Sequence, residues 1–175
     1  AYVDFGGESA IPLVRSYPNL LVVQTLSKSR SLAGLRVGLA VGSPELVAGL
    51  ERARYSFNPY NPDRLALAGA IESFRDEAYF QENCRKVIET RERTAGRLVE
   101  MGFTVVPSRA NFLFITHEKH AAEELLQGLR DGGVLVRYFD RPRISDYLRV
   151  TVGTDDEMKV FLEQSGELIS PGTQT

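Results

Sequence analysis

The segment around Lys28 contains most of the groups that a protein uses to bind a phosphate. It also holds Ser27, Ser29, Ser31, Gly34 and Arg36. Hydroxyl and backbone N–H groups give directional donors, and a guanidinium can contact two phosphate oxygens at once. The order of residues differs from the GxxxxGK[ST] loop of nucleotide-binding proteins. A lysine in this setting could instead form a Schiff base with an aldehyde cofactor that carries its own phosphate, although a solvated lysine in a serine-rich loop would look the same.

Two arginines occur inside segments that are otherwise apolar. Arg149 falls in the predicted strand 147–152, on the face opposite Leu148 and Val150, and Arg137 falls in the same manner in the predicted strand 134–139. A charge on a partly buried strand face requires a partner. A carboxylate or phosphate of a substrate would satisfy it, and so would an acidic side chain in a structural ion pair. The residues alone leave both interpretations open.

The N-terminal part of the chain predicts an α/β arrangement that places Lys28 just past a strand. Residues 1–5 (AYVDF) read as the end of a strand, and the apolar run 19–26 predicts a strand buried on both faces, as in a parallel sheet. Ligands in open α/β sheets bind outside the carboxyl ends of such strands. A second buried strand is predicted over 35–41, followed by a helix that Ser43 caps and that runs to about Tyr55.

Residues 58–62 (NPYNP) form a proline-rich loop that is the best candidate for a change of subdomain. Beyond it, the pattern predicts helices over 63–74, 77–101, 121–131 and 155–169, and strands over 103–106, 111–116, 134–139 and 147–152. Helices and strands segregated in this way indicate helices packed on a small sheet, an α+β layer. We therefore divide the chain into an α/β region (1–57), linking helices (58–101) and a small α+β C-terminal domain (102–175).

The composition excludes several function classes. The 175 residues are 43% hydrophobic and 25% charged with a formal net charge of -2, which predicts a folded core and no nucleic-acid partner. The single Cys84 excludes a disulfide framework, and His117 with His120 lacks further ligands, so no metal site is predicted. No apolar run is long enough to span a bilayer and no signal peptide is visible, so we expect a cytoplasmic protein with no membrane partner.

Residues 25–38, TLSKSRSLAGLRVG, resemble the lysine segment of the fold-type I pyridoxal-phosphate-dependent aminotransferases. The resemblance is closest to the histidinol-phosphate aminotransferase family, with its S-K-x-x-x-L-A-G-L-R pattern. Residues 1–5 are similar to that family's D-E-A-Y-x-x-F segment, entered two residues late, and 58–61 (NPYN), 110–112 (ANF) and 148–153 (LRVTVG) are similar to later segments. Because these similarities follow family order up to about Gly153, the chain resembles the C-terminal half of a family member. We expect such an incomplete fragment to be inactive alone.

The resemblance implies a role for each matching residue near the lysine. Lys28 would form the Schiff base with pyridoxal 5'-phosphate and would move the proton between the substrate α-carbon and the cofactor. Ser27 and Arg36 would bind the cofactor phosphate, and Tyr2 would hydrogen-bond the cofactor's phenolic oxygen. Residues 1–57 would then be the C-terminal part of the large cofactor-binding domain.

The resemblance also implies a reaction and its substrate ligands. Arg149 would hold the α-carboxylate of an amino-acid or keto-acid substrate, and Arg137 would be a second anion ligand. The family converts L-histidinol phosphate and 2-oxoglutarate into imidazole acetol phosphate and L-glutamate in histidine biosynthesis, and acts as a homodimer. Another fold-type I aminotransferase, a threonine-phosphate decarboxylase or, in a different class, a non-catalytic phosphate-binding α/β module would share the Lys28 segment, so these alternatives stay open.

Overall fold

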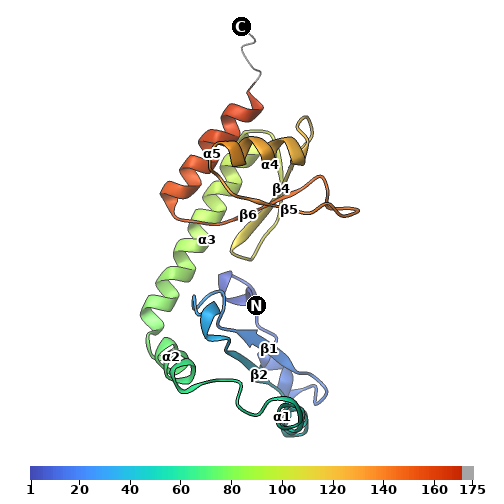
Figure 1. The fold of residues 1–175 in the computed structure, drawn as a ribbon, viewed down its shortest axis with the longest axis vertical. Helices are drawn as coiled ribbons and strands as arrows, with labels where there is room; N and C mark the ends of the chain where they lie inside the picture. The colour runs from blue at the N-terminus through green and yellow to red at the C-terminus, as the bar shows by residue number, and fades with distance from the viewer. Residues whose placement is uncertain (171–175) are drawn as a thin grey trace. The chain divides into compact units, whose positions relative to one another are not determined.

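A computed structural model describes residues 1–170 of the chain (Figure 1). The chain forms two compact units: unit 1 is Ala1–Cys84, and unit 2 begins at Arg85. Helix α3 (Glu77–Glu100) begins in unit 1 and ends in unit 2. Within residues 1–170, no helix is both long and apolar enough to cross a membrane.

Unit 1 contains a small sheet and several helices. In chain order its elements are the 3₁₀ helices η1 (Val3–Phe5) and η2 (Ile11–Arg15), strand β1 (Val22–Thr25), the 3₁₀ helix η3 (Ala33–Leu35), strand β2 (Gly38–Val41) and helices α1 (Pro44–Phe57) and α2 (Arg64–Arg75). Strands β1 and β2 pair antiparallel, with Thr25 opposite Gly38. A small apolar core, built from Leu26, Val37, Ala66 and Ala70, joins the loop between the two strands to α2.

Several predictions for unit 1 are wrong. Residues 1–5 do not end a strand, because Val3–Phe5 form a 3₁₀ turn that Gly6 closes at φ 97°. The run 19–26 contains only the short β1, which is antiparallel to β2 and leaves Val23 66% exposed. The segment 35–41 completes η3 before β2 begins, and most of β2 is exposed. An apolar run predicts a strand that is buried on both faces in the middle of a parallel sheet. Within residues 1–170, β1 instead pairs with β2 alone.

Polar caps begin two of the predicted helices. The Ser43 side chain accepts a hydrogen bond from the backbone N–H of Leu46 at the start of α1. Helix α5 (Asp155–Ile169) begins with a capping box, in which the side chains of Thr154 and Glu157 each accept from the other residue's backbone N–H. These bonds satisfy N–H groups that a helix leaves unpaired in its first turn, and they depend on residues only a few positions apart.

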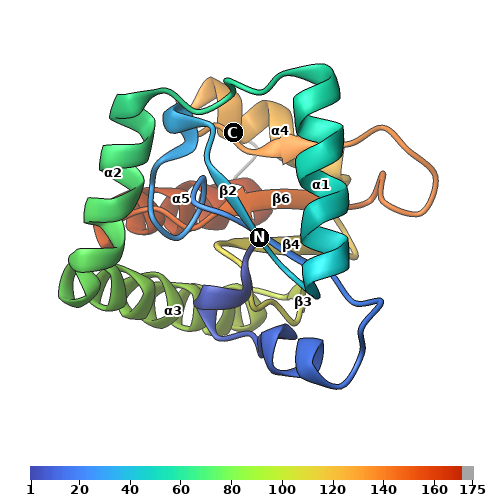
Figure 2. The same cartoon turned by 90° about the horizontal axis from the view of Figure 1, so that it is seen from below.

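Unit 2 is an antiparallel sheet with helices packed on it, as the α+β pattern predicts. Besides the end of α3, its elements are β3 (Phe103–Val106), β4 (Phe112–His117), α4 (Ala122–Asp131), β5 (Arg137–Tyr138), β6 (Leu148–Thr151) and α5. The strand order is β3-β4-β6-β5, and Figure 2 shows β3, β4 and β6 side by side. Gly102, at φ 91°, ends α3 and starts the chain into β3.

One face of this sheet forms the core of unit 2. Alternate residues of β4 and β6 are buried there: Leu113, Ile115, Leu148 and Val150. They pack against side chains of all three helices, namely Leu98 of α3, Ala122, Leu125 and Leu129 of α4, and Met158 and Phe161 of α5. The intervening residues, which include Phe112, Phe114 and Arg149, therefore project from the opposite face of the sheet.

We expect Leu113→Ala to lower the free energy of unfolding of unit 2 by about 2–5 kcal/mol, because it leaves a cavity in a closed core. Leu113 is 1% exposed, whereas Leu135 of the same unit is 81% exposed. Leu135→Ala is thus a matched control that should change the unfolding free energy by about 0.5 kcal/mol or less. Urea unfolding followed by circular dichroism measures both, and equal effects would contradict this description of the core.

Candidate functional site

The Lys28 loop is closed at its base by backbone hydrogen bonds. The Leu26 N–H donates to the Val37 carbonyl at 3.2 Å, and the Leu32 N–H donates to the Leu26 carbonyl at 3.0 Å. A tight turn follows Lys28, in which the Ser31 N–H donates to the Lys28 carbonyl at 3.1 Å and Ser31 has φ 56°. The loop is therefore a defined structure and not an extended surface segment.

Lys28 lies beside Tyr2, from which 25 residues separate it in sequence. The Lys28 Nζ is 5.9 Å from the centroid of the Tyr2 ring, and the lysine side chain is exposed. The next residue, Ser29, is buried and donates from Oγ to Oδ2 of Asp4, two residues after Tyr2. This contact ties the η1 segment to the Lys28 loop, and the sequence pattern offered no signal for it.

Ser27 and Arg36 lie at the base of the same loop. Ser27 directly follows Leu26 and Arg36 directly precedes Val37, so the loop closure brings the two backbone segments together. The Ser27 N–H donates to Oγ1 of Thr25 at 3.1 Å, and the Arg36 side chain donates from Nη1 to the Ala33 carbonyl at 2.8 Å. Arg36 is exposed and has φ 56°, a left-handed conformation that ends η3.

This donor set fits an aldehyde that carries a phosphate. An exposed amine can react with the aldehyde carbon, while a guanidinium and a hydroxyl of the same loop can bind phosphate oxygens. Tyr2 adds a phenolic hydroxyl on the lysine side of the loop. The four residues that the sequence singled out in unit 1 are thus gathered in one loop and the segment beside it.

Arg149 and Arg137 are cross-strand neighbours in unit 2. The register of β5 and β6 places them directly opposite each other, so both project from the sheet face that the helices leave uncovered. The Arg149 guanidinium lies 5.3 Å from the Phe112 ring centroid and 5.8 Å from that of Phe139, and the Arg137 guanidinium lies 5.2 Å from the Phe139 ring. Sequence reasoning did not identify these two aromatic neighbours.

The arginine pair has the electrostatics of an anion site. Like charges that face each other across two strands destabilise a sheet, so an anion between them would be favourable. Within residues 1–170, the Nε of Arg149 is buried and has no hydrogen-bond partner. A buried donor without a partner is costly, and a carboxylate or phosphate oxygen would satisfy it.

Cys84 and the histidine pair have structural surroundings. Cys84 is buried, and its pKa is raised chiefly by desolvation. The His117 ring packs edge-on against Phe103 at 4.9 Å and lies 4.7 Å from His120, while its Nδ1 accepts from the Lys119 N–H. In the part of the chain that the structure describes, no cluster of three or more His, Cys, Asp or Glu side chains is placed to hold a metal ion.

We expect protonation of His117 to lower the free energy of unfolding in mild acid. Burial, followed by the neighbouring charge of His120, lowers the pKa of His117 from its ordinary value of 6.5. A group whose pKa is lower in the folded state contributes stability above the unfolded pKa and loses it as the pH falls through the folded pKa. Urea unfolding between pH 7.5 and 5 should therefore show a smaller loss for His117→Gln than for the wild type, and parallel curves would exclude this role.

Comparison with known proteins identifies relatives along nearly the whole chain. Curated histidinol-phosphate aminotransferases from Clostridium botulinum (strain Hall) and Acinetobacter baumannii (strain SDF) are 54% identical over 97% of the chain and 57% identical over 90% of it. The alignments cover 48% and 44% of those proteins, so the chain spans about half the length of the curated relatives it matches.

The fold agrees with this relationship. The crystal structure of histidinol-phosphate aminotransferase from Sinorhizobium meliloti in complex with pyridoxal-5'-phosphate superposes with a TM-score of 0.83 and 26% identity, over 96% of this chain and 46% of that one. The prediction of a mixed α/β, fold-type I aminotransferase architecture is thereby confirmed. The family model for aminotransferase class I and II matches residues 1–164, and the chain therefore belongs to that family.

Proposed function

We propose that this chain is part of a pyridoxal-phosphate-dependent aminotransferase of histidine biosynthesis. The enzyme would transfer the amino group of L-histidinol phosphate to 2-oxoglutarate, giving imidazole acetol phosphate and L-glutamate. The observation that supports the proposal is the Lys28 loop, in which an exposed amine lies beside the Tyr2 ring and Ser27 and Arg36 flank the residues that close the loop. The high identity to curated histidinol-phosphate aminotransferases supports the choice of substrate.

Each residue of the loop has a proposed task in this reaction. The Lys28 Nζ would hold the aldehyde carbon of the cofactor and would move a proton at the substrate α-carbon. Ser27 and Arg36 would hold the phosphate, and the Tyr2 hydroxyl would donate a hydrogen bond to the ring oxygen. Pyridoxal phosphate supplies an electron-withdrawing ring that stabilises negative charge at the α-carbon.

The arginine pair has a proposed task in substrate binding. Arg149 binds the α-carboxylate of the glutamate and 2-oxoglutarate pair, and its unpartnered buried Nε supports this role. Arg137, which lies opposite it across the strands, acts as a second anion ligand. A guanidinium suits both tasks, because it binds carboxylate and phosphate oxygens in pairs.

The organisation of the whole enzyme is also part of the proposal. Residues 1–57 belong to the large cofactor-binding domain, 58–101 are linking helices and 102–175 form the small domain, of which 171–175 lie outside the described residues. The enzyme is a cytoplasmic homodimer that works on small molecules. Because the chain spans about half the length of its curated relatives, we expect it to be inactive by itself.

The test is a substrate comparison with the intact protein that contains this chain. The protein is saturated with pyridoxal phosphate and supplied with 2-oxoglutarate and either L-histidinol phosphate or another amino donor, and L-glutamate is measured. We expect a kcat/KM for L-histidinol phosphate at least about 100-fold above that of other donors, the range that a site built to pair polar substrate groups can reach. Release of carbon dioxide from O-phospho-L-threonine would instead favour the decarboxylase. Phosphate binding without any reaction would favour a non-catalytic module.

A further inference from the structure

Arg30 follows Lys28 by two residues, but its side chain leaves the loop and reaches the junction of α2 and α3. The Arg30 guanidinium lies 4.1 Å from the Phe74 ring centroid and 3.8 Å from that of Phe80, one ring from each helix. The Arg30 side chain is only 9% exposed, although it carries a full charge. A cation held between two aromatic rings is attracted by both ring faces.

The Arg30 guanidinium also has polar partners at the same junction. Its Nη1 donates to the carbonyl oxygen of Ser73, in the last turn of α2, where carbonyls lack partners within the helix. Its Nη2 lies 3.4 Å from Oε2 of Glu77, the first residue of α3. One side chain of the lysine loop thus binds both the end of one helix and the start of the next.

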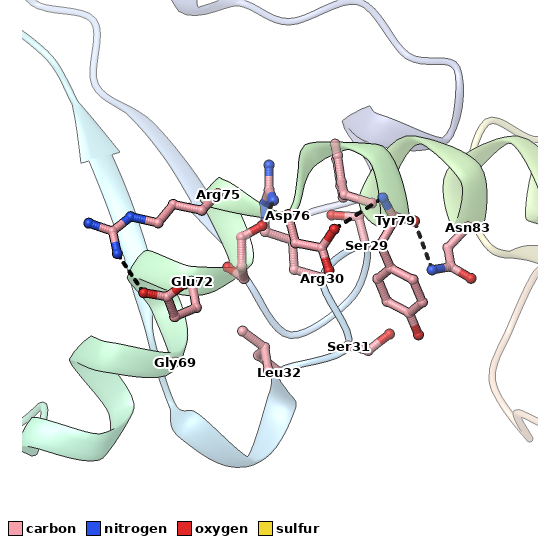
Figure 3. Close-up of a pocket in the computed structure, with 12 residues that line it drawn as sticks. Ser29, Arg30, Ser31, Leu32, Gly69, Glu72, Arg75, Asp76, Tyr79 and Asn83 are labelled. Carbon is pink, nitrogen blue, oxygen red and sulfur yellow. Dashed lines mark hydrogen bonds and ion pairs between the residues drawn. The ribbon is translucent and has the colours of Figure 1, made fainter.

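The space around Arg30 makes this attachment important. A cavity of about 600 Å³ lies beside it, lined on one side by the loop residues Ser31 and Leu32 and on the other by Arg75 and Tyr79 of the two helices (Figure 3). Loop and helices are therefore not closely packed along this cavity. Arg30 bridges the two sides of this cavity, and the apolar core that contains Leu26 also joins the loop to α2.

We propose that Arg30 is a positioning residue that fixes the Lys28 loop to the α2–α3 junction and so holds the Lys28 amine in place for the cofactor. The role rests on the proposed function, but the clamp itself is a property of the chain without any ligand. Because a lysine at position 30 could keep the charge without the planar contact to two rings or the forked donor geometry, it would restore the clamp only in part.

The first measurement needs no cofactor. Hydrogen exchange of residues 26–36 is followed in the intact protein before pyridoxal phosphate is added, for wild type, Arg30→Gln and the matched control Arg75→Gln. Arg75 lines the same cavity but is exposed and pairs with Glu72 of its own helix. We expect about tenfold faster exchange of the loop in Arg30→Gln alone, the change that loss of a stacked, hydrogen-bonded cation produces. Wild-type exchange in Arg30→Gln would overturn the proposal.

The second measurement follows the cofactor in the same variants. For Arg30→Gln we expect an about tenfold higher Kd for pyridoxal phosphate, a shifted pH titration of the bound cofactor's absorbance and a lower kcat with KM changed by less than about twofold. Arg30→Lys should fall between Arg30→Gln and the wild type. Effects of equal size in Arg75→Gln, or an unchanged Kd and pH titration in Arg30→Gln, would contradict a positioning role.

A further variant separates the clamp from a general folding defect and from the proposed function. Phe80→Leu removes one ring of the stack and keeps the arginine, so it should speed hydrogen exchange of the loop less than Arg30→Gln does. It therefore tests the clamp even if Arg30→Gln does not fold. If wild-type protein binds no pyridoxal phosphate, the proposed function fails, and the exchange comparison still decides whether Arg30 fixes the loop. If the loop of both single variants, Phe80→Leu and Arg30→Gln, exchanges as slowly as in the wild type, the proposed clamp is wrong.

Discussion

Lys28→Ala in the intact protein abolishes covalent capture of pyridoxal phosphate and lowers kcat/KM by on the order of 10⁴-fold or more, because one side chain supplies both the nucleophile and the proton carrier. Lys28 is the one lysine within residues 1–84, and Lys86, Lys119 and Lys159 all follow in unit 2. Reduction with borohydride after addition of pyridoxal phosphate, followed by peptide mass spectrometry, locates the adduct. We expect it on Lys28 in the wild type and nowhere in the variant.

Two further proteins serve as controls for the lysine experiment. Lys86→Ala changes an exposed lysine of α3 and should leave the adduct and the activity unchanged. Lys28→Arg keeps the positive charge without a reactive amine and should be as inactive as Lys28→Ala. An adduct on another lysine with activity retained would exclude Lys28 as the nucleophile. An adduct on the intact protein but not on this chain alone would show that the remaining sequence completes the site.

Arg149→Gln raises the KM for 2-oxoglutarate by about 30-fold or more and leaves the adduct on Lys28 intact. Removing one member of a buried charge pair costs about 2–5 kcal/mol, and about 1.4 kcal/mol corresponds to a factor of ten. The expectation rests on the buried, unpartnered Nε of Arg149 and on the two rings that hold its guanidinium. Steady-state kinetics with each substrate varied in turn makes the measurement.

Comparison with other arginines tests whether this effect is specific. Arg137→Gln should have a smaller effect on KM, because Arg137 is exposed where Arg149 is partly buried. Arg141→Gln, an exposed arginine of the following loop, should have none. An unchanged KM in Arg149→Gln, together with increased stability from relief of the facing charges, would indicate that the pair binds no substrate anion.

The sequence by itself determined the elements whose signals are local. Helix α5 occupies the predicted residues 155–169 because its capping box involves positions only three apart, and β3 occupies the predicted 103–106 directly after the glycine that ends α3. The position of Arg149 on the sheet face opposite its apolar neighbours was also predictable, because successive residues of a strand point to opposite faces. The Lys28 segment was identifiable for the same reason, because its chemistry lies within ten consecutive residues, 27–36.

The tertiary structure alone decided which distant residues meet. It paired β1 antiparallel with β2, set Arg137 opposite Arg149 and placed the rings of Phe74 and Phe80 on Arg30, more than 40 residues away. An apolar run or a lone arginine indicates that the side chains need partners. It does not indicate which residues those partners are. Register, strand direction and long-range stacking follow from packing of the whole chain, so the attachment of the lysine loop could not be predicted from the sequence.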